Sequence, residues 1–215
     1  MAADAAAEAT VVFVTFEGIE GAGKSTLMAA VVHAFEQRAV PYVATREPGG
    51  TPLGERLRAV FIDPNLAIEP WAEVFVLSAA RAQLVRDVIE PALARGETVL
   101  CDRYYHAMIA YQGFGRGLDR ARLFDLARMA THGVEPDLTF VIDIPPALSA
   151  ARIAERTKLG ARTDRLEGEG GAFHERVRNG YLAMANDIAR VVVLDGTLAV
   201  PQLTAQVLQA IGVAP

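Results

Sequence analysis

Short apolar runs alternate along the chain with longer segments of helical period. Residues 11–16 are almost continuously apolar, which is typical of a strand buried on both faces of a parallel sheet. Four more runs of this kind predict strands at 42–45, 98–102, 138–144 and 191–194. After the first run, Leu27, Ala30, Val31, Ala34 and Phe35 follow the spacing of an amphipathic helix. Further helices are predicted at 53–61, 70–94, 121–131, 146–156, 172–189 and 200–211.

This alternation predicts an α/β fold with a central parallel sheet of about five strands and helices on both faces. Ligands of such sheets bind at the carboxyl ends of the strands. Residues 11–215 are expected to form a single domain, preceded by a disordered tail at 1–10. Residues 157–171 are rich in charge and glycine and have no stable apolar period, so a mobile lid is expected there.

Composition narrows the class of protein. The chain has 215 residues, enough for a sizeable core, and a net charge of -5, too acidic for a protein that coats nucleic acid. The single cysteine, Cys101, excludes an internal disulfide and favours the reducing cytoplasm. No apolar run approaches the roughly 20 residues that cross a bilayer. The amino terminus lacks the basic region of a secretory signal, so a cytoplasmic protein without membrane contact is expected.

A phosphate-binding motif lies between the first predicted strand and the helix that follows it. The residues GIEGAGKS match GxxxxGK[ST] in the required context, which disfavours a merely structural glycine turn. Backbone N–H groups and the helix N-terminus would hold phosphates, Lys24 would meet the β and γ phosphates, and Ser25 would face Mg²⁺. The predicted ATP-binding residues are Gly18, Ile19, Glu20, Gly21, Ala22, Gly23, Lys24, Ser25 and Thr26.

The motif alone does not separate switches, motors and kinases. No asparagine is followed by the lysine of NKxD, which disfavours a guanine-nucleotide switch, and the length suits a small kinase. Three more groups fall at or after predicted strand ends: TREPGG at 45–50, DRY at 102–104 with YQG at 111–113, and DRLE at 164–167. Two anion sites could then face one another, as phosphoryl transfer requires.

With these motifs the chain resembles the thymidylate kinases. The resemblance is carried by FEGIEGAGKST, TREPGG, AEVFVLSAARAQL, DRY followed by AYQGFGRGL, PDLTFVIDIPP and DRLE, and runs from about Val11 to the last helix. It implies a P-loop nucleoside monophosphate kinase fold and Mg²⁺-dependent transfer of the γ-phosphoryl group of ATP to dTMP, giving dTDP and ADP for dTTP supply. It also implies a homodimer, formed through apolar helices such as 70–94.

The resemblance also assigns residue roles. Arg103 would hold the acceptor phosphate, Asp102 would lie near the metal, and Glu20 would lie near the sugar 3′-hydroxyl. Two purely structural alternatives exist. Asp102 and Arg103 could form an ion pair, and Glu20 could be an acid that the helix N-terminus favours. Arg81 would bind the base carbonyl at position 4, and the alternative is an arginine that reaches to the surface. Tyr111 would close on the sugar 2′ position, and the alternative is a role in packing alone. Arg46 and Gln112 complete the polar side of the expected substrate site.

Two substrate-side positions depart from the family. Leu77 replaces the phenylalanine that stacks on thymine, with Phe75 two residues earlier, and Met108 ends a stretch where polar residues are usual. Losing the stacking face would weaken base binding by about 1 kcal/mol. Ordinary dTMP remains the favoured substrate. Two alternatives stay open: a modified deoxypyrimidine monophosphate, and a regulatory nucleotide-binding module with weak catalysis.

Cations in the lid are expected to stabilise the transition state. Some family members carry an arginine inside the phosphate motif, whereas this chain has Gly21 there. Arg152, Arg156, Lys158, Arg162 and Arg165 all lie in or near the expected lid. We predict that Arg156 and Arg162 supply the charge that develops on the moving phosphoryl group.

Overall fold

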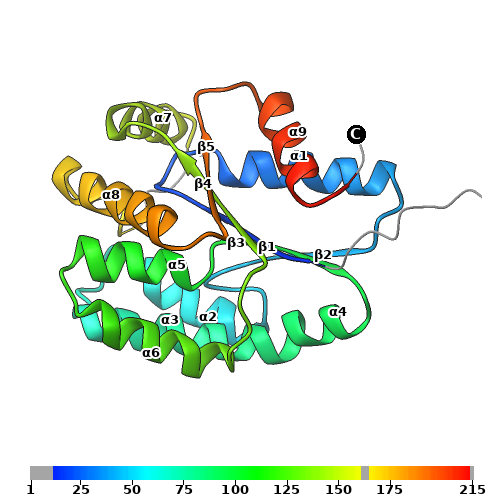
Figure 1. Ribbon diagram of the computed structural model, residues 1–215. Coiled ribbons are helices and arrows are strands. Elements are labelled where there is room, and N and C mark those ends of the chain that lie inside the picture. Colours follow the sequence, from blue (N-terminus) through cyan, green and yellow to red (C-terminus); the bar gives the residue numbers. More distant parts are fainter. Residues whose placement is uncertain (1–11, 161–164, 214–215) are drawn as a thin grey trace, which may run out of the picture.

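A five-stranded parallel sheet runs through the centre of the molecule, in the order β2-β3-β1-β4-β5 (Figure 1). The structure, a computed structural model, describes residues 12–160 and 165–213. The strands are β1 Phe13–Glu17, β2 Tyr42–Arg46, β3 Thr98–Asp102, β4 Leu138–Asp143 and β5 Val191–Asp195. Every residue of the central strand β1 is buried, because helices cover both faces of the sheet. The predicted strands and the α/β fold class are confirmed.

Helices cover the two faces of the sheet (Figure 1). On one face, α1 (Lys24–Gln37) packs against α9 (Val200–Ala210). On the other, α3 (Pro70–Leu84) contacts α2 (Pro52–Ile62) and α6 (Arg120–Thr131). Next to β4, α7 (Pro146–Lys158) contacts α8 (Gly171–Asp187). None of the helices in the described part of the chain is both long and apolar enough to span a membrane.

The predicted helix at 70–94 is interrupted. It consists of α3, a π-helical segment η1 at Val85–Ile89, and α4 at Glu90–Ala94. Pro91 explains the interruption, because it has no backbone N–H to donate to a carbonyl one turn earlier. Its ring also crowds that turn, and the wider π geometry relieves the crowding.

A helical segment was not predicted between β3 and α6. Residues Tyr105–Met108 form α5, and Ile109–Gly115 continue as the π-helical segment η2. The sequence did not predict this segment because it contains glycines, which disfavour helix formation. Gly115 is needed here for packing, because a Cβ atom at this position would lie 2.7 Å from the ring of Phe173 on α8.

The expected lid is partly described. Helix α7 extends to Lys158, residues 165–168 form a turn, and α8 begins at Gly171. Residues 161–164 and the expected tail at 1–10 lie outside the described residues. The mobility of residues 157–171 therefore stays a prediction.

Candidate active site

One large cleft opens at the carboxyl ends of the strands. Its volume is about 1110 Å³, and both the phosphate motif and the predicted substrate residues line it. The phosphate loop, residues 18–25, joins β1 to α1 and needs glycine: Gly18, Gly21 and Gly23 all have positive φ. A Cβ atom at Gly18 would lie 2.5 Å from the carbonyl oxygen of Ile142. The loop therefore presents backbone to the cleft, as a phosphate site requires.

Lys24 is held inside this loop by two backbone carbonyl groups. Its Nζ donates to the carbonyl oxygens of Gly18 at 3.1 Å and Ile19 at 3.0 Å. Burial, and then the nearby Arg103 guanidinium, lowers the pKa of Lys24 to about 8. A phosphate anion would offset both of these unfavourable influences on the ammonium group.

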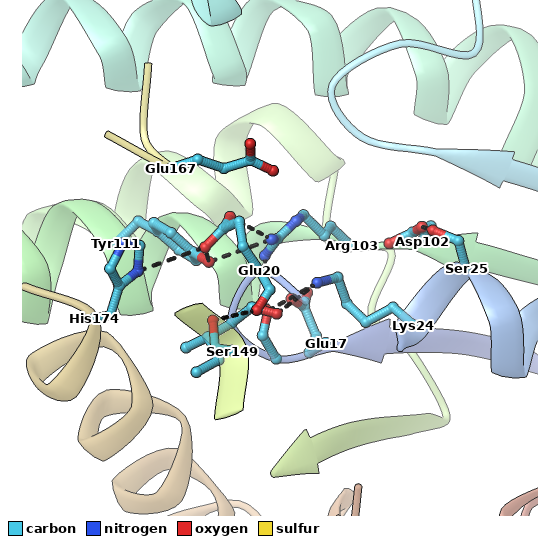
Figure 2. A network of polar contacts seen from close by, with 12 residues as sticks. Glu17, Glu20, Lys24, Ser25, Asp102, Arg103, Tyr111, Ser149, Glu167 and His174 are labelled. Carbon is cyan, nitrogen blue, oxygen red and sulfur yellow. Dashed lines mark hydrogen bonds and ion pairs between the residues drawn. The ribbon is translucent and has the colours of Figure 1, made fainter. Parts of the chain in front are cut away.

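Ser25 and Asp102 meet where a metal was predicted. The Ser25 hydroxyl donates to Asp102 Oδ2 at 2.7 Å, and Figure 2 shows the two side chains beside each other. Both offer the hard oxygen atoms that Mg²⁺ prefers. The described residues contain no group of three or more His, Cys, Asp or Glu side chains that could hold a metal by themselves. The pair thus fits an ion that keeps waters and phosphate oxygens as its other ligands.

Arg103 crosses the middle of the cleft in a constrained conformation. Its φ of 72° is in the left-handed region, which is unusual for a residue with a side chain. Its guanidinium donates to Gly18 O at 3.1 Å and Tyr181 Oη at 3.2 Å. It also donates to Glu20 Oε1 at 2.8 Å and Tyr111 Oη at 3.2 Å (Figure 2). The alternative Asp102–Arg103 ion pair is absent from the described contacts, because Glu20 is the acid that pairs with Arg103.

Glu20 links this arginine to the sugar-side tyrosine. Its Oε2 accepts the Tyr111 hydroxyl at 2.5 Å and lies 3.7 Å from His174 Nδ1. Burial opposes ionisation of Glu20, but the Arg103 and Lys24 cations and the Tyr111 hydrogen bond outweigh it and lower its pKa. The Ser149 hydroxyl on α7 donates to the Glu20 carbonyl at 2.6 Å. Tyr111 is thus buried, as packing requires, and also hydrogen-bonded to the predicted acid.

Glu17 is a site residue that the sequence analysis did not identify. Its Oε1 accepts the backbone N–H of Tyr104 at 2.7 Å, and its Oε2 accepts the Tyr181 hydroxyl at 2.8 Å. Burial raises its pKa to about 7, although Arg103 opposes the shift. The signal in the sequence was a single acid at the end of an apolar strand. Glu17 therefore supports both the backbone after Arg103 and, through Tyr181, the Arg103 guanidinium.

The predicted base-reading residues gather at the far end of the cleft. Arg81 is 1% exposed, which rules out surface snorkelling, and its Nε and Nη2 contact Glu47 Oε2 at 2.8 and 2.7 Å. Its Nη1 lies 3.6 Å from Met108 Sδ. Burial raises the pKa of Glu47 to about 7, against the influence of Arg81. Leu77 lines the cleft, whereas Phe75 is 59% exposed and not a substitute for the family phenylalanine there.

Two further predicted substrate residues are held by acids. The exposed Arg46 pairs with Glu55 at 3.0 Å at the cleft margin. Gln112 is fully buried, and its Nε2 donates to Glu73 Oε2 at 2.7 Å.

The lid cations do not share one position. Arg152 on α7 donates to Gly21 O at 3.0 Å, so it touches the phosphate loop, although the sequence analysis did not favour it. Arg156 lines the cleft and pairs with Glu167. Arg165 instead bonds Glu73 and the carbonyl of Phe61, away from the phosphate loop. Arg162, the other favoured cation, lies outside the described residues.

Comparisons with known proteins agree with this geometry. A family model described as thymidylate kinase matches residues 16–207. The thymidylate kinase of Deinococcus radiodurans is 46% identical over 200 residues, covering 93% of this chain and 95% of the relative. That of Citrifermentans bemidjiense is 47% identical over 189 residues, covering 86% and 84%. The crystal structure of thymidylate kinase from Ehrlichia chaffeensis has a TM-score of 0.74 at 28% identity and covers 94% of this chain and 98% of that one.

Proposed function

This chain belongs to the thymidylate kinase family, and on that premise we propose how its cleft moves the γ-phosphoryl group of ATP to dTMP. The enzyme is an ATP-dependent phosphotransferase whose products are dTDP and ADP. The observation that carries the proposed mechanism is the convergence of the phosphate loop, Arg103 and Arg81 on one cleft. That cleft offers one site for a triphosphate and another for an acceptor nucleotide, as an in-line transfer requires.

On the ATP side, the phosphate loop does the binding. Its backbone N–H groups and the N-terminus of α1 hold the β and γ phosphates, and Lys24 moves from the loop carbonyls to these phosphates. Ser25 and Asp102 would hold Mg²⁺, which neutralises phosphate charge when it is bound. This assignment rests on their 2.7 Å contact and their oxygen chemistry.

On the acceptor side, Arg103 holds the dTMP phosphate. A guanidinium can meet two phosphate oxygens at once, and the contacts with Glu20 and Tyr181 fix its plane. Glu20 is then placed near the sugar 3′-hydroxyl, with Tyr111 against the 2′ position. Arg46 assists at the acceptor phosphate.

Arg152 and Arg156 are the proposed transition-state cations among the described residues. Both lie on α7 and line the cleft, and Arg152 already contacts the loop where some relatives carry an arginine. A cation there would stabilise charge that develops on the transferred group. Arg162 remains a further candidate in the same role, within a mobile lid at 157–171 of a single domain.

A homodimer in the cytoplasm is the proposed assembly and location. Phe75 on α3 is 59% exposed and Met129 on α6 is 72% exposed, and these two helices contact each other. Exposed apolar side chains on neighbouring helices favour association with a second copy. Sedimentation equilibrium of the enzyme and of Phe75→Lys tests this, with a monomeric wild type as the contrary result.

The decisive assay for function is ADP release with Mg-ATP and a panel of acceptors. The panel is dTMP, dUMP, 5-hydroxymethyl-dUMP, dCMP, dGMP and UMP. We expect a clear preference for dTMP, and Lys24→Ala should lower turnover with every acceptor by about 100- to 1,000-fold. Preference for 5-hydroxymethyl-dUMP would favour a modified substrate, and no acceptor-dependent turnover would favour a regulatory module.

A further inference from the structure

A fully buried acid lies behind the base-reading residues. Glu73 is on α3, four residues before Leu77 and eight before Arg81, so the three share one helix face. Leu77 and Arg81 line the cleft, but Glu73 does not, and its side chain is 0% exposed. Glu73 therefore lies one helical turn before Leu77, outside the lining of the cleft.

Donors from two other segments converge on the Glu73 carboxylate. Gln112 Nε2 donates to Oε2 at 2.7 Å, and Arg116 on the segment after η2 donates to Oε1 at 3.1 Å. Arg165, at the end of the lid, donates to Oε1 at 2.5 Å. Arg116 also pairs with Glu169 at 2.6 Å, so the cluster contains two acids and two arginines. The formal charges of the cluster therefore balance.

The carboxylate fixes which way the Gln112 amide points. An ionised carboxylate accepts hydrogen bonds and donates none, so the group of Gln112 that faces it must be the NH₂. The amide oxygen Oε1 is left as the free polar atom. It is buried and has no hydrogen-bond partner among the described residues, although a buried acceptor normally has one.

Gln112 and Met108 both line the cleft, and they differ in strength as hydrogen-bond acceptors. Gln112 lines the cleft four residues after Met108, whose thioether is a weak acceptor already approached by Arg81 and Ser78. Thymine carries an N3–H donor, whereas cytosine carries an unprotonated N3 acceptor. An amide fixed with its oxygen free would accept from thymine and repel cytosine.

We propose that Glu73 is a positioning residue for base selectivity, which holds the Gln112 carboxamide with its oxygen available to the N3–H of the acceptor nucleotide. This inference rests on the proposed function, because it concerns the base of the same dTMP site. Glu73 acts through Gln112 and does not touch substrate.

The test is the isosteric variant Glu73→Gln. A glutamine at position 73 can donate as well as accept, so Gln112 is free to turn its NH₂ toward the cleft. Selectivity is measured as the Ki of dCMP, as a competitive inhibitor, divided by the KM of dTMP. We expect this ratio to fall about tenfold while the KM of ATP changes less than twofold. Loss of stability alone would not move this ratio.

The matched control is Glu169→Gln. It makes the same charge change in the same cluster and removes a partner of the same Arg116, but Glu169 does not contact Gln112 in the described structure. Its selectivity should stay within twofold of the wild type. An equal loss in this variant would show that cluster charge, not the orientation of Gln112, is what matters, and would overturn the proposal.

A double variant tests whether Glu73 acts through Gln112. Gln112→Leu should lower selectivity by itself, and adding Glu73→Gln should change it little further, since coupled residues are not additive. Full additivity would overturn the proposal. If Glu73→Gln does not fold, Gln112→Leu still tests the contact through which Glu73 would act: unchanged selectivity refutes the proposal, and a tenfold loss supports that contact. A wild type unable to phosphorylate dTMP would refute the proposed function instead.

Discussion

The two ends of the cleft are built on different principles. At the phosphate end, defined by Glu17, Glu20, Lys24 and Arg103, the Arg103 guanidinium pairs with Glu20 and shares the Tyr181 hydroxyl with Glu17, while Lys24 is held by loop carbonyls. At the base end, defined by Leu77, Arg81, Met108 and Gln112, two polar side chains are each held by one acid among apolar neighbours. The phosphate end is thus a network of charged and polar groups centred on Arg103. The base end is a pocket in which Arg81 and Gln112 are each oriented by one acidic partner.

This difference follows from the two tasks. Phosphoryl transfer spreads negative charge over moving oxygens, so preorganised cations there act most strongly on the transition state. A base remains chemically unchanged, so contacts to it stabilise substrate and transition state alike. Variants at the phosphate end should therefore lower kcat, and variants at the base end should mainly raise the KM of dTMP.

The largest expected effect is that of Lys24→Ala. Removal of one preorganised donor to the transferred group lowers kcat by about 100- to 1,000-fold. The side chain contacts loop carbonyls, so its loss leaves the fold intact. Steady-state kinetics with a circular dichroism control measure this. A raised KM with unchanged kcat would contradict the contrast between the two ends.

The next largest expected effect is the difference in unfolding free energy between Arg81→Met and Arg46→Met. Arg81 and its partner Glu47 are almost fully buried, whereas Arg46 and Glu55 are about half exposed. Loss of a partner from a buried pair costs about 3–5 kcal/mol of unfolding free energy, and from an exposed pair at most about 1 kcal/mol. Urea unfolding of both variants measures the difference. Equal costs would show that burial does not distinguish these pairs.

The pH dependence of stability probes the phosphate end. Burial raises the pKa of Glu17 from 4.5 to about 7, so between these values the folded protein keeps a proton that the unfolded chain has lost. The unfolding free energy therefore falls as the pH rises from about 4.5 through about 7. Relative to Glu17→Gln, which cannot titrate, the wild type should lose about 3 kcal/mol.

Urea titrations of both proteins at pH 5, 6, 7 and 8 give this difference in unfolding free energy. The contributions of other titrating groups cancel in the difference where the substitution does not perturb them. A difference that is flat, or that rises with pH, would show that Glu17 is ionised throughout.

Local pattern was enough to predict the sheet and the phosphate loop. The inner strands β1, β3 and β4 were visible because burial on both faces demands continuous apolar runs, and the loop because its glycines and Lys24 occupy fixed spacings. The segment Tyr105–Gly115 was missed because Gly115 was retained for contact with Phe173, which local propensity does not report. Tertiary packing outweighed helix propensity there.

Most of the residues predicted for the site line one cleft, but the contacts among them could not be predicted from the sequence. Glu17 was missed because its partners Tyr104 and Tyr181 are 87 and 164 residues away in the sequence. The contact of Arg152 with the phosphate loop was not predicted for a similar reason. Helix α7 is set against the phosphate loop by the Ser149 hydroxyl, which donates to the Glu20 carbonyl, and this directs Arg152 to Gly21.

The smallest expected effect concerns the apolar wall of the base end. Leu77 is 7% exposed and lines the cleft with Met108, where it offers contact but no aromatic face. Leu77→Phe should strengthen dTMP binding by about 1 kcal/mol, close to fivefold in affinity, because stacked rings gain that much beyond area burial.

Calorimetric titration with dTMP measures this change, and ATP titration is the control, which should stay within twofold. Overpacking could instead lower the unfolding free energy, so urea unfolding separates the two effects. If dTMP affinity is unchanged in a stable Leu77→Phe, the base does not lie against this wall, and selectivity rests on the polar groups Arg81 and Gln112 alone.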